Sequence, residues 1–166
     1  VFLCMASSDK LNNKNLETVF GVIIERGGLN DFLAFPKRKP SLEHNWPDVN
    51  GNDIDLSSPT FEARQFTLKC ALIATGANEQ EKNDNFWTLY NGLFTELSGE
   101  GTHDLYLSTI DRTYSVYYVD QTSVSKVSYE DNRMIIKFDL IFQEADPFTN
   151  ITKVYLVDED DNYLIA

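Results

Sequence analysis

One segment of the chain, residues 79–97, has a clear helical period, and this segment limits what the rest can fold into. Its apolar residues recur three and four positions apart and form one stripe along a helix: Phe86, Leu89, Tyr90, Leu93, Phe94 and Leu97. Glu79, Glu81 and Asp84 suit the positive end of the helix dipole. Gly99 follows the stripe and can adopt the left-handed conformation that ends a helix. An amphipathic helix of this kind needs an apolar surface to pack on.

That surface is predicted to be one face of a β-sheet, because most of the remaining chain has the patterns of strands. In residues 61–75 the side chains alternate with the period of two that is typical of a half-buried strand. One face of this strand carries Phe66, Leu68, Cys70, Leu72 and Ala74. Further strands are predicted over residues 18–25, 32–35, 105–109, 114–119, 124–129, 134–142, 151–157 and 163–165, with a small hairpin of residues 44–49 and 53–56 around Asn50-Gly51.

Together these patterns predict a mostly β (α+β) protein, an antiparallel β-sandwich or split barrel with one flanking amphipathic α-helix. At 166 residues the chain suits one main domain, which we place at residues 18–146. A flexible, polar N-terminal arm is expected over residues 1–17, and a C-terminal β-hairpin extension over residues 147–166. The uncharged stretch before Ala6 is too short for a signal peptide, and one hypothesis is that Met5 is the natural start.

The formal net charge of −12 argues against a nucleic-acid binder and against an anionic membrane surface, because binding to either depends on Lys and Arg. The acidity would suit a protein that lets nucleic acid slide past, although solubility alone is the favoured explanation. The basic cluster Lys37-Arg38-Lys39 is interpreted as a solvated loop. The two cysteines, Cys4 and Cys70, form no spacing motif, and Cys70 is expected to pack as a small buried side chain.

The sequence offers no catalytic, cofactor or metal motif. His44 and His103 have no cysteine or histidine at ligand spacing. Residues 48–59 resemble a calcium loop only superficially, because glycine stands at position four and Pro59 replaces the bidentate glutamate. Residues 158–162 also have ligand types without the required glycine, and both segments are interpreted as turns. We therefore expect no enzyme activity, no cofactor and no metal.

The order of the predicted elements resembles a known family. Short motifs along residues 18–145 carry the resemblance: Phe20-Gly21-Val22-Ile23-Ile24, Gly27-Gly28, Phe32-Leu33-Ala34-Phe35-Pro36, Asn45-Trp46-Pro47, Ile54-Asp55-Leu56, Phe61-Glu62-Ala63-Arg64, Phe66-Thr67-Leu68, Phe86-Trp87-Thr88-Leu89-Tyr90, Leu105-Tyr106-Leu107 and residues 114–118. In this order they resemble tail proteins of long-tailed bacteriophages. The similarity is to the N-terminal domain of the distal tail protein and to tail-tube-like proteins, of the kind encoded by prophages of Bacteroides-type bacteria.

The resemblance implies a structural virion protein with a β-sandwich and one flanking helix. Its copies would join into a homo-oligomeric ring, a hexamer, at the tail tube or baseplate, around a channel for the tape-measure protein and DNA. Neighbouring tail-tube, baseplate and tape-measure proteins would be its partners, and no sequence-specific nucleic acid or membrane is implied. Its location would be the virion tail, after assembly in the bacterial cytoplasm. The acidic hairpin after Pro147 departs from the family pattern.

Two other functions stay open at this level. A monomeric β-sandwich module that binds a ligand such as a carbohydrate would use exposed aromatic side chains, for which Tyr114, Tyr117 and Tyr118 are candidates. The other is an enzyme whose site leaves no sequence signature. For a ring, the predicted contact surfaces are the second face of residues 61–75 with Ala71 and Ile73, the tyrosine-rich hairpin of residues 106–118, and the terminal segments 6–17 and 151–166.

Overall fold

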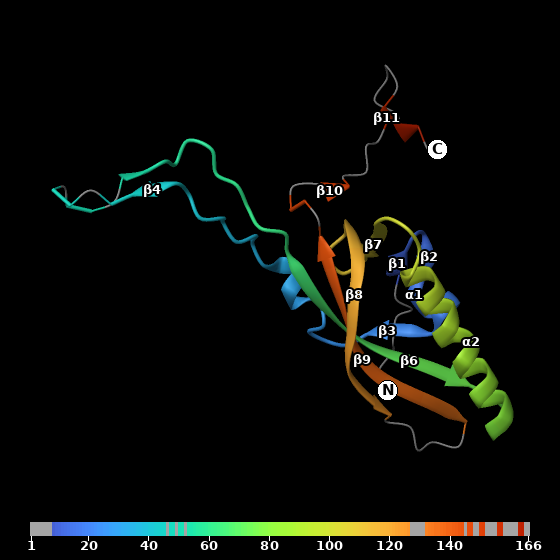
Figure 1. Ribbon diagram of the computed structural model, residues 1–166. Coiled ribbons are helices and arrows are strands. Elements are labelled where there is room, and N and C mark those ends of the chain that lie inside the picture. The colour runs from blue at the N-terminus through green and yellow to red at the C-terminus, as the bar shows by residue number, and fades with distance from the viewer. Residues whose placement is uncertain are drawn as a thin grey trace.

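One large antiparallel sheet organises the molecule (Figure 1). The computed structural model describes residues 8–45, 47–48, 50–51, 53–126, 132–144, 146–147, 150–151, 156–157 and 163–164. Within these residues the strands of the sheet follow the order β2-β1-β7-β8-β9-β6-β3, and β10 also pairs with β8. The strands are β1 (Lys10–Leu11), β2 (Lys14–Asn15), β3 (Val22–Ile24), β6 (Gln65–Thr75), β7 (His103–Leu107), β8 (Arg112–Lys126), β9 (Arg133–Glu144) and β10 (Asn150–Ile151).

Two small hairpins and three helical segments complete the described chain. The hairpins are β4 (Glu43–His44) with β5 (Asp53–Ile54), and β11 (Leu156–Val157) with β12 (Tyr163–Leu164). The helical segments are α1 (Leu16–Phe20), the 3-10 helix η1 (Asn30–Leu33) and α2 (Glu79–Leu97). The hairpin predicted around Asn50-Gly51 is thus confirmed, although residues 45–52 make its connection longer than a tight turn. Gly51 in this connection has a positive φ of 89°.

The longest unbroken pairing in the sheet joins β6 and β9, which run antiparallel along the whole of β6, from Gln65↔Gln143 to Thr75↔Arg133. The alternation predicted for this strand is confirmed, because its five inward side chains are all buried. Each of them lies opposite an apolar residue of β9. These pairs are Phe66 with Phe142, Leu68 with Leu140, Cys70 with Phe138, Leu72 with Ile136 and Ala74 with Met134.

Helix α2 has the bounds that the apolar stripe predicts. Its N-cap is Asn78, whose side chain accepts a hydrogen bond of 2.9 Å from the Glu81 backbone N–H. The stripe is buried at Phe86, Leu93 and Leu97, while other members of it reach the surface. The prediction for Gly99 is wrong, because the helix ends on Ser98 with φ of −87°, and the left-handed glycine is Gly101.

The sheet is curled, and a single core cluster occupies its concave side. Leu16 and Phe20 from α1, Phe32 from η1 and the buried residues of α2 all join the strand side chains in this cluster. The fold is therefore mostly β, with a curled antiparallel sheet and few helices, as in a β-sandwich or half-barrel. This confirms the predicted fold class, whereas the proposed boundary between a main domain and a C-terminal extension at residues 146–147 stays a prediction.

Some local predictions are corrected. Residues 8–17 are not a loose arm, because Lys10–Leu11 pairs with β7 and Leu11 and Leu16 lie in the core. Residues 32–35 are not a strand, because η1 buries Phe32 by turning the chain. Residues 114–119 and 124–126, predicted to lie in two strands, belong to the single strand β8, whereas residues 127–129 lie outside the described residues. Strand β8 carries register shifts between Tyr118 and Asp120 and between Thr122 and Ser125. The calcium-like segment 158–162 lies outside the described residues.

Candidate assembly surfaces

The most prominent surface feature is a hairpin arm, residues 36–60, which leaves the body between η1 and β6. Its strands β4 and β5 pair with each other and, among the described residues, with no other strand. Figure 1 shows the arm reaching far from the sheet. No described residue of the arm belongs to the core cluster, although apolar side chains are spaced along it and at its root. These exposed side chains are Leu33, Phe35, Leu42, Ile54 and Leu56.

The exposure of these side chains is unusual for a chain that folds alone. Phe35 is 96% exposed and Leu42 is 78% exposed. Single exposed apolar residues need no explanation, but a series of them on a projecting segment marks a contact surface. The basic cluster at the base of the arm is exposed, as predicted, and Lys37 forms a solvent-screened ion pair of 3.4 Å with Glu62. The arm is therefore a candidate for burial against another chain.

The arm is tied to the sheet by a buried ion pair. Arg64 donates from Nε and from Nη2 to Oε2 of Glu144, at 2.8 and 2.5 Å. Its Nη1 donates to the carbonyl of Ala34 at the other root of the arm, at 3.0 Å. The guanidinium also lies 5.0 Å from the ring centre of Phe66 and 5.9 Å from that of Tyr114. One arginine thus joins both roots of the arm to the end of β9.

The Glu144 side chain is 1% exposed, so its charge is held almost without water. Burial raises the pKa of Glu144, and the Arg64 hydrogen bonds oppose that rise. Its Oε1 has no hydrogen-bond partner in the described part of the chain. Sequence reasoning missed this pair, because the two residues stand 80 positions apart and no local pattern connects them.

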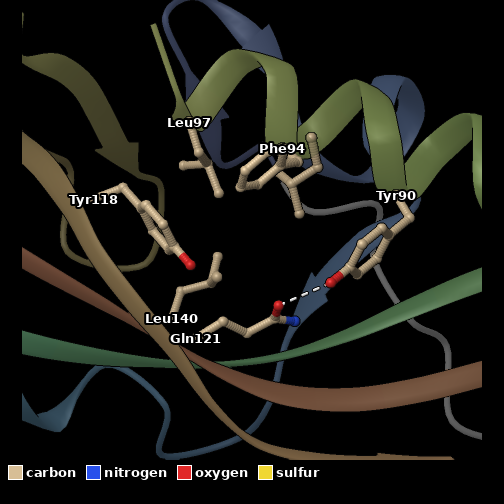
Figure 2. A pocket seen from close by; sticks show the side chains of 7 residues that line it. Tyr90, Phe94, Leu97, Tyr118, Gln121 and Leu140 are labelled. Carbon is tan, nitrogen blue, oxygen red and sulfur yellow. Dashed lines mark hydrogen bonds between the residues drawn. The ribbon is translucent and has the colours of Figure 1, made fainter.

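A narrow cleft separates α2 from β8 (Figure 2). Tyr90, Phe94 and Leu97 point from the helix toward Tyr118, Gln121 and Leu140, and the Tyr90 hydroxyl donates to Gln121 Oε1 at 2.9 Å. The cleft has a volume of about 20 Å³, which is enough for little more than one water molecule. It is therefore a packing contact between helix and sheet and not a ligand site.

The tyrosines proposed for sugar stacking are placed less favourably than the sequence suggested. Tyr114 is buried at 3% exposure, and its hydroxyl donates to the Phe32 carbonyl at 3.2 Å. Burial also raises the pKa of Tyr114. Tyr117 and Tyr118 are half-buried. The prediction that Tyr114 is exposed is therefore wrong.

The other residues singled out from sequence are scattered over the structure. Ala71 is buried and Ile73 is half-buried, so the second face of β6 offers less apolar contact than expected. His103 is a buried strand-end residue whose ring nitrogens contact the Leu97 carbonyl at 3.2 Å and the Asn12 amide at 3.1 Å. Cys70 is buried as predicted. In the described ranges, no three residues of metal-ligand type gather into a site.

A comparison with solved structures finds a protein of similar fold. The chain resembles a phage protein. One similar structure is the Dit protein of phage SPP1, described as a paradigm of the hub of the adsorption apparatus in phages that infect Gram-positive bacteria. The TM-score is 0.59 at 14% sequence identity, over 86% of this chain. The match covers 51% of Dit, so the chain corresponds to about half the length of that protein.

At this level of identity the likeness to Dit shows a shared fold. No protein-family model and no curated protein sequence matches the chain. Among the described residues, no helix is long and apolar enough to cross a membrane. The shared fold is the mostly β fold that the family resemblance of the sequence implies.

Proposed function

We propose that the chain is a structural protein of a phage or prophage tail, related in role to the N-terminal domain of a distal tail protein. Its copies form a closed ring, of six subunits, at the tail tube or baseplate, around the channel for the tape-measure protein and DNA. Its partners are further copies of itself and the neighbouring tail-tube, baseplate and tape-measure proteins. It acts in the virion tail after assembly in the bacterial cytoplasm, and it has no catalytic role. Its origin in a Bacteroides-type prophage stays a prediction that the neighbouring genes would test.

The observation that carries this proposal is the hairpin arm on a Dit-like sheet. The arm exposes Leu42 and Leu56, its root exposes Phe35, and none of these three side chains joins the core of its own subunit. A segment of this kind gains stability only when another surface covers its apolar side chains. In a head-to-tail ring every subunit supplies one arm and one receiving surface, and closure leaves no arm uncovered. The net charge of −12 also suits a channel past which DNA must slide.

Light scattering on size-exclusion fractions tests the proposal. Across a rising concentration series, the full chain should shift from monomer to one larger species of defined mass. A variant in which a short Gly-Ser linker replaces residues 37–61 should stay monomeric at every concentration. Its melting temperature should change little, because no described residue of that segment lies in the core. A strictly monomeric full chain that binds a soluble sugar tightly would contradict the ring and favour the ligand-binding module.

A further inference from the structure

A hollow of about 650 Å³ lies where the curled sheet brings its two ends close together. Strand β3 is the last strand at one end of the sheet, and Asp9 stands directly before β1, the next-to-last strand at the other end. Both β3 and Asp9 border this hollow. Its apolar lining consists of Ile23, Ile24, Leu29, Leu33 and Ile110. We call it the hollow beside β3.

One wall of the hollow beside β3 is a strand edge. Among the described residues, β3 pairs only with β6. The Glu25 N–H donates to the Lys69 carbonyl at 2.9 Å, which turns the Glu25 backbone toward β6. Backbone direction alternates along an antiparallel pair, so the N–H and C=O of Ile24 point away from β6. An edge of this kind accepts an extended segment that brings both hydrogen bonds and apolar side chains.

The N-terminal end of the described chain lies in this hollow. Ser8 and Asp9 both line it. Asp9 is held firmly, because its Oδ1 accepts from the Ser108 N–H and hydroxyl, both at 2.7 Å, and its side chain is buried. Its carbonyl also accepts from the Leu16 N–H at 2.9 Å. Residues 1–7 lie outside the described residues, and they join the fold at the mouth of the hollow.

The sequence before Ser8 matches the apolar lining of the hollow. It begins Val1-Phe2-Leu3-Cys4-Met5, five apolar residues without a charge. Such a run is prone to aggregation when it is left exposed, and Val and Phe favour extended backbone. Seven residues in extended form span about 23 Å, at about 3.3 Å per residue, whereas the three residues of β3 span about 10 Å. The segment is therefore long enough to follow the whole β3 edge in either direction.

We propose that residues 1–5 add to the Ile24 edge of β3 and cover the apolar lining of the hollow within the same subunit. The added segment would bridge the two ends of the curled sheet and cover the exposed edge of β3. Its attachment at Ser8 favours it over any separate chain, because a short link gives an effective concentration of about 1 mM or more. The contact lies inside one subunit, so it is independent of the proposed ring.

Hydrogen exchange followed by mass spectrometry tests the contact, at a concentration where light scattering shows a monomer. About half of the amides of residues 3–7 should exchange at least about tenfold more slowly than in a free peptide of the same sequence. The reason is that alternate N–H groups of an added strand bond to its neighbour. In a chain that lacks residues 1–5, residues 22–25 should exchange faster than in the parent chain. Exchange of residues 3–7 at the rate of the free peptide would contradict the proposal.

Two exposed leucines provide a matched pair of variants. Leu33 lines the hollow and is 64% exposed, whereas Leu42 lies on the arm, away from the hollow, and is 78% exposed. Neither belongs to the core cluster, so both variants should fold. Leu33→Asp should bring the exchange of residues 3–7 to within about twofold of the free peptide, because it places a charge in the apolar lining. Leu42→Asp should leave that exchange unchanged.

Two results of these measurements would overturn the proposed contact. Equal protection of residues 3–7 in the Leu33→Asp and Leu42→Asp variants would show that the segment does not dock in the hollow beside β3. Protection that appears only in an assembled species would assign the segment to a neighbouring copy. Neither result bears on whether the chain forms a ring, which the native mass decides.

Discussion

Among the single residues, Arg64 makes the contacts that hold the root of the arm. This one side chain binds Glu144 at the end of β9, donates to Ala34 and lies against the rings of Phe66 and Tyr114. A buried ion pair contributes little net stability by itself, because both charges lose their water. Removing one partner is different, since it leaves an uncompensated charge in the interior. We infer that the pair fixes where the arm leaves the body.

The variant Arg64→Ala should therefore lower the free energy of unfolding by about 3–5 kcal/mol, the range found when one member of a buried pair is removed. Lys37→Ala is the matched control, because it breaks an exposed pair and should change stability by less than about 1 kcal/mol. Urea unfolding monitored by circular dichroism measures both. Equal, small losses would show that the buried pair does not anchor the arm root.

The pH dependence gives a second measurement on the same variant. The folded-state pKa of Glu144 is raised above its usual value of 4.5 by burial. Its titration therefore favours the folded state at low pH, and this contribution is lost as the pH rises through the folded-state pKa. Without Arg64 nothing opposes the rise in the Glu144 pKa. The difference in free energy of unfolding between wild type and Arg64→Ala should therefore widen from pH 4.5 to neutral pH. A gap that narrows over this interval would contradict the assignment.

At the scale of the element, α2 and β6 are the parts that sequence alone predicts well. In both elements the apolar side chains recur with a regular period over more than ten residues, every 3.6 residues in the helix and every 2 residues in the strand. The β1–β2 hairpin had a shorter signal that the sequence interpretation missed. Asn12 and Asn13 form its two-residue turn with φ of 48° and 64°, and asparagine is favoured at such positions. The η1 turn had no comparable sequence signal, because its conformation depends on the burial of Phe32 against Phe66 and Tyr114.

The packing of α2 against the sheet can be tested with two variants of the helix. Leu93 is buried at 4% exposure in the middle of the stripe, so Leu93→Asp places an unpaired charge in the core. It should cost about 3 kcal/mol or more in the free energy of unfolding. Asn91→Asp, on the exposed face of the same helix, should shift stability by less than about 0.5 kcal/mol. Thermal melts of the two variants decide it, and similar small shifts in both would mean that α2 does not pack as described.

At the scale of the whole molecule, the contact surfaces were the hardest part to predict. The second face of β6 and Tyr114 were expected to be available, yet Ala71 is buried and Tyr114 packs against the rings of Phe32 and Phe66. The arm was anticipated only as a small hairpin, because nothing local shows that a hairpin projects from the body. The hollow beside β3 is lined by residues of β3, of the segment that leads into η1 and of the β7–β8 turn, so it exists only in the folded chain.

The most direct measurement of the central claim is the native mass of the assembly, with negative-stain images of the same sample. The subunit mass is 19.0 kDa, and the account predicts one discrete species at six times that value, imaged as closed rings. The variant that lacks residues 37–61 should give monomers under the same conditions. A full chain that stays at the subunit mass at every concentration, with or without tail partners, would contradict the account. Rings that persist in the arm-deleted variant would show that the arm is not what joins the subunits.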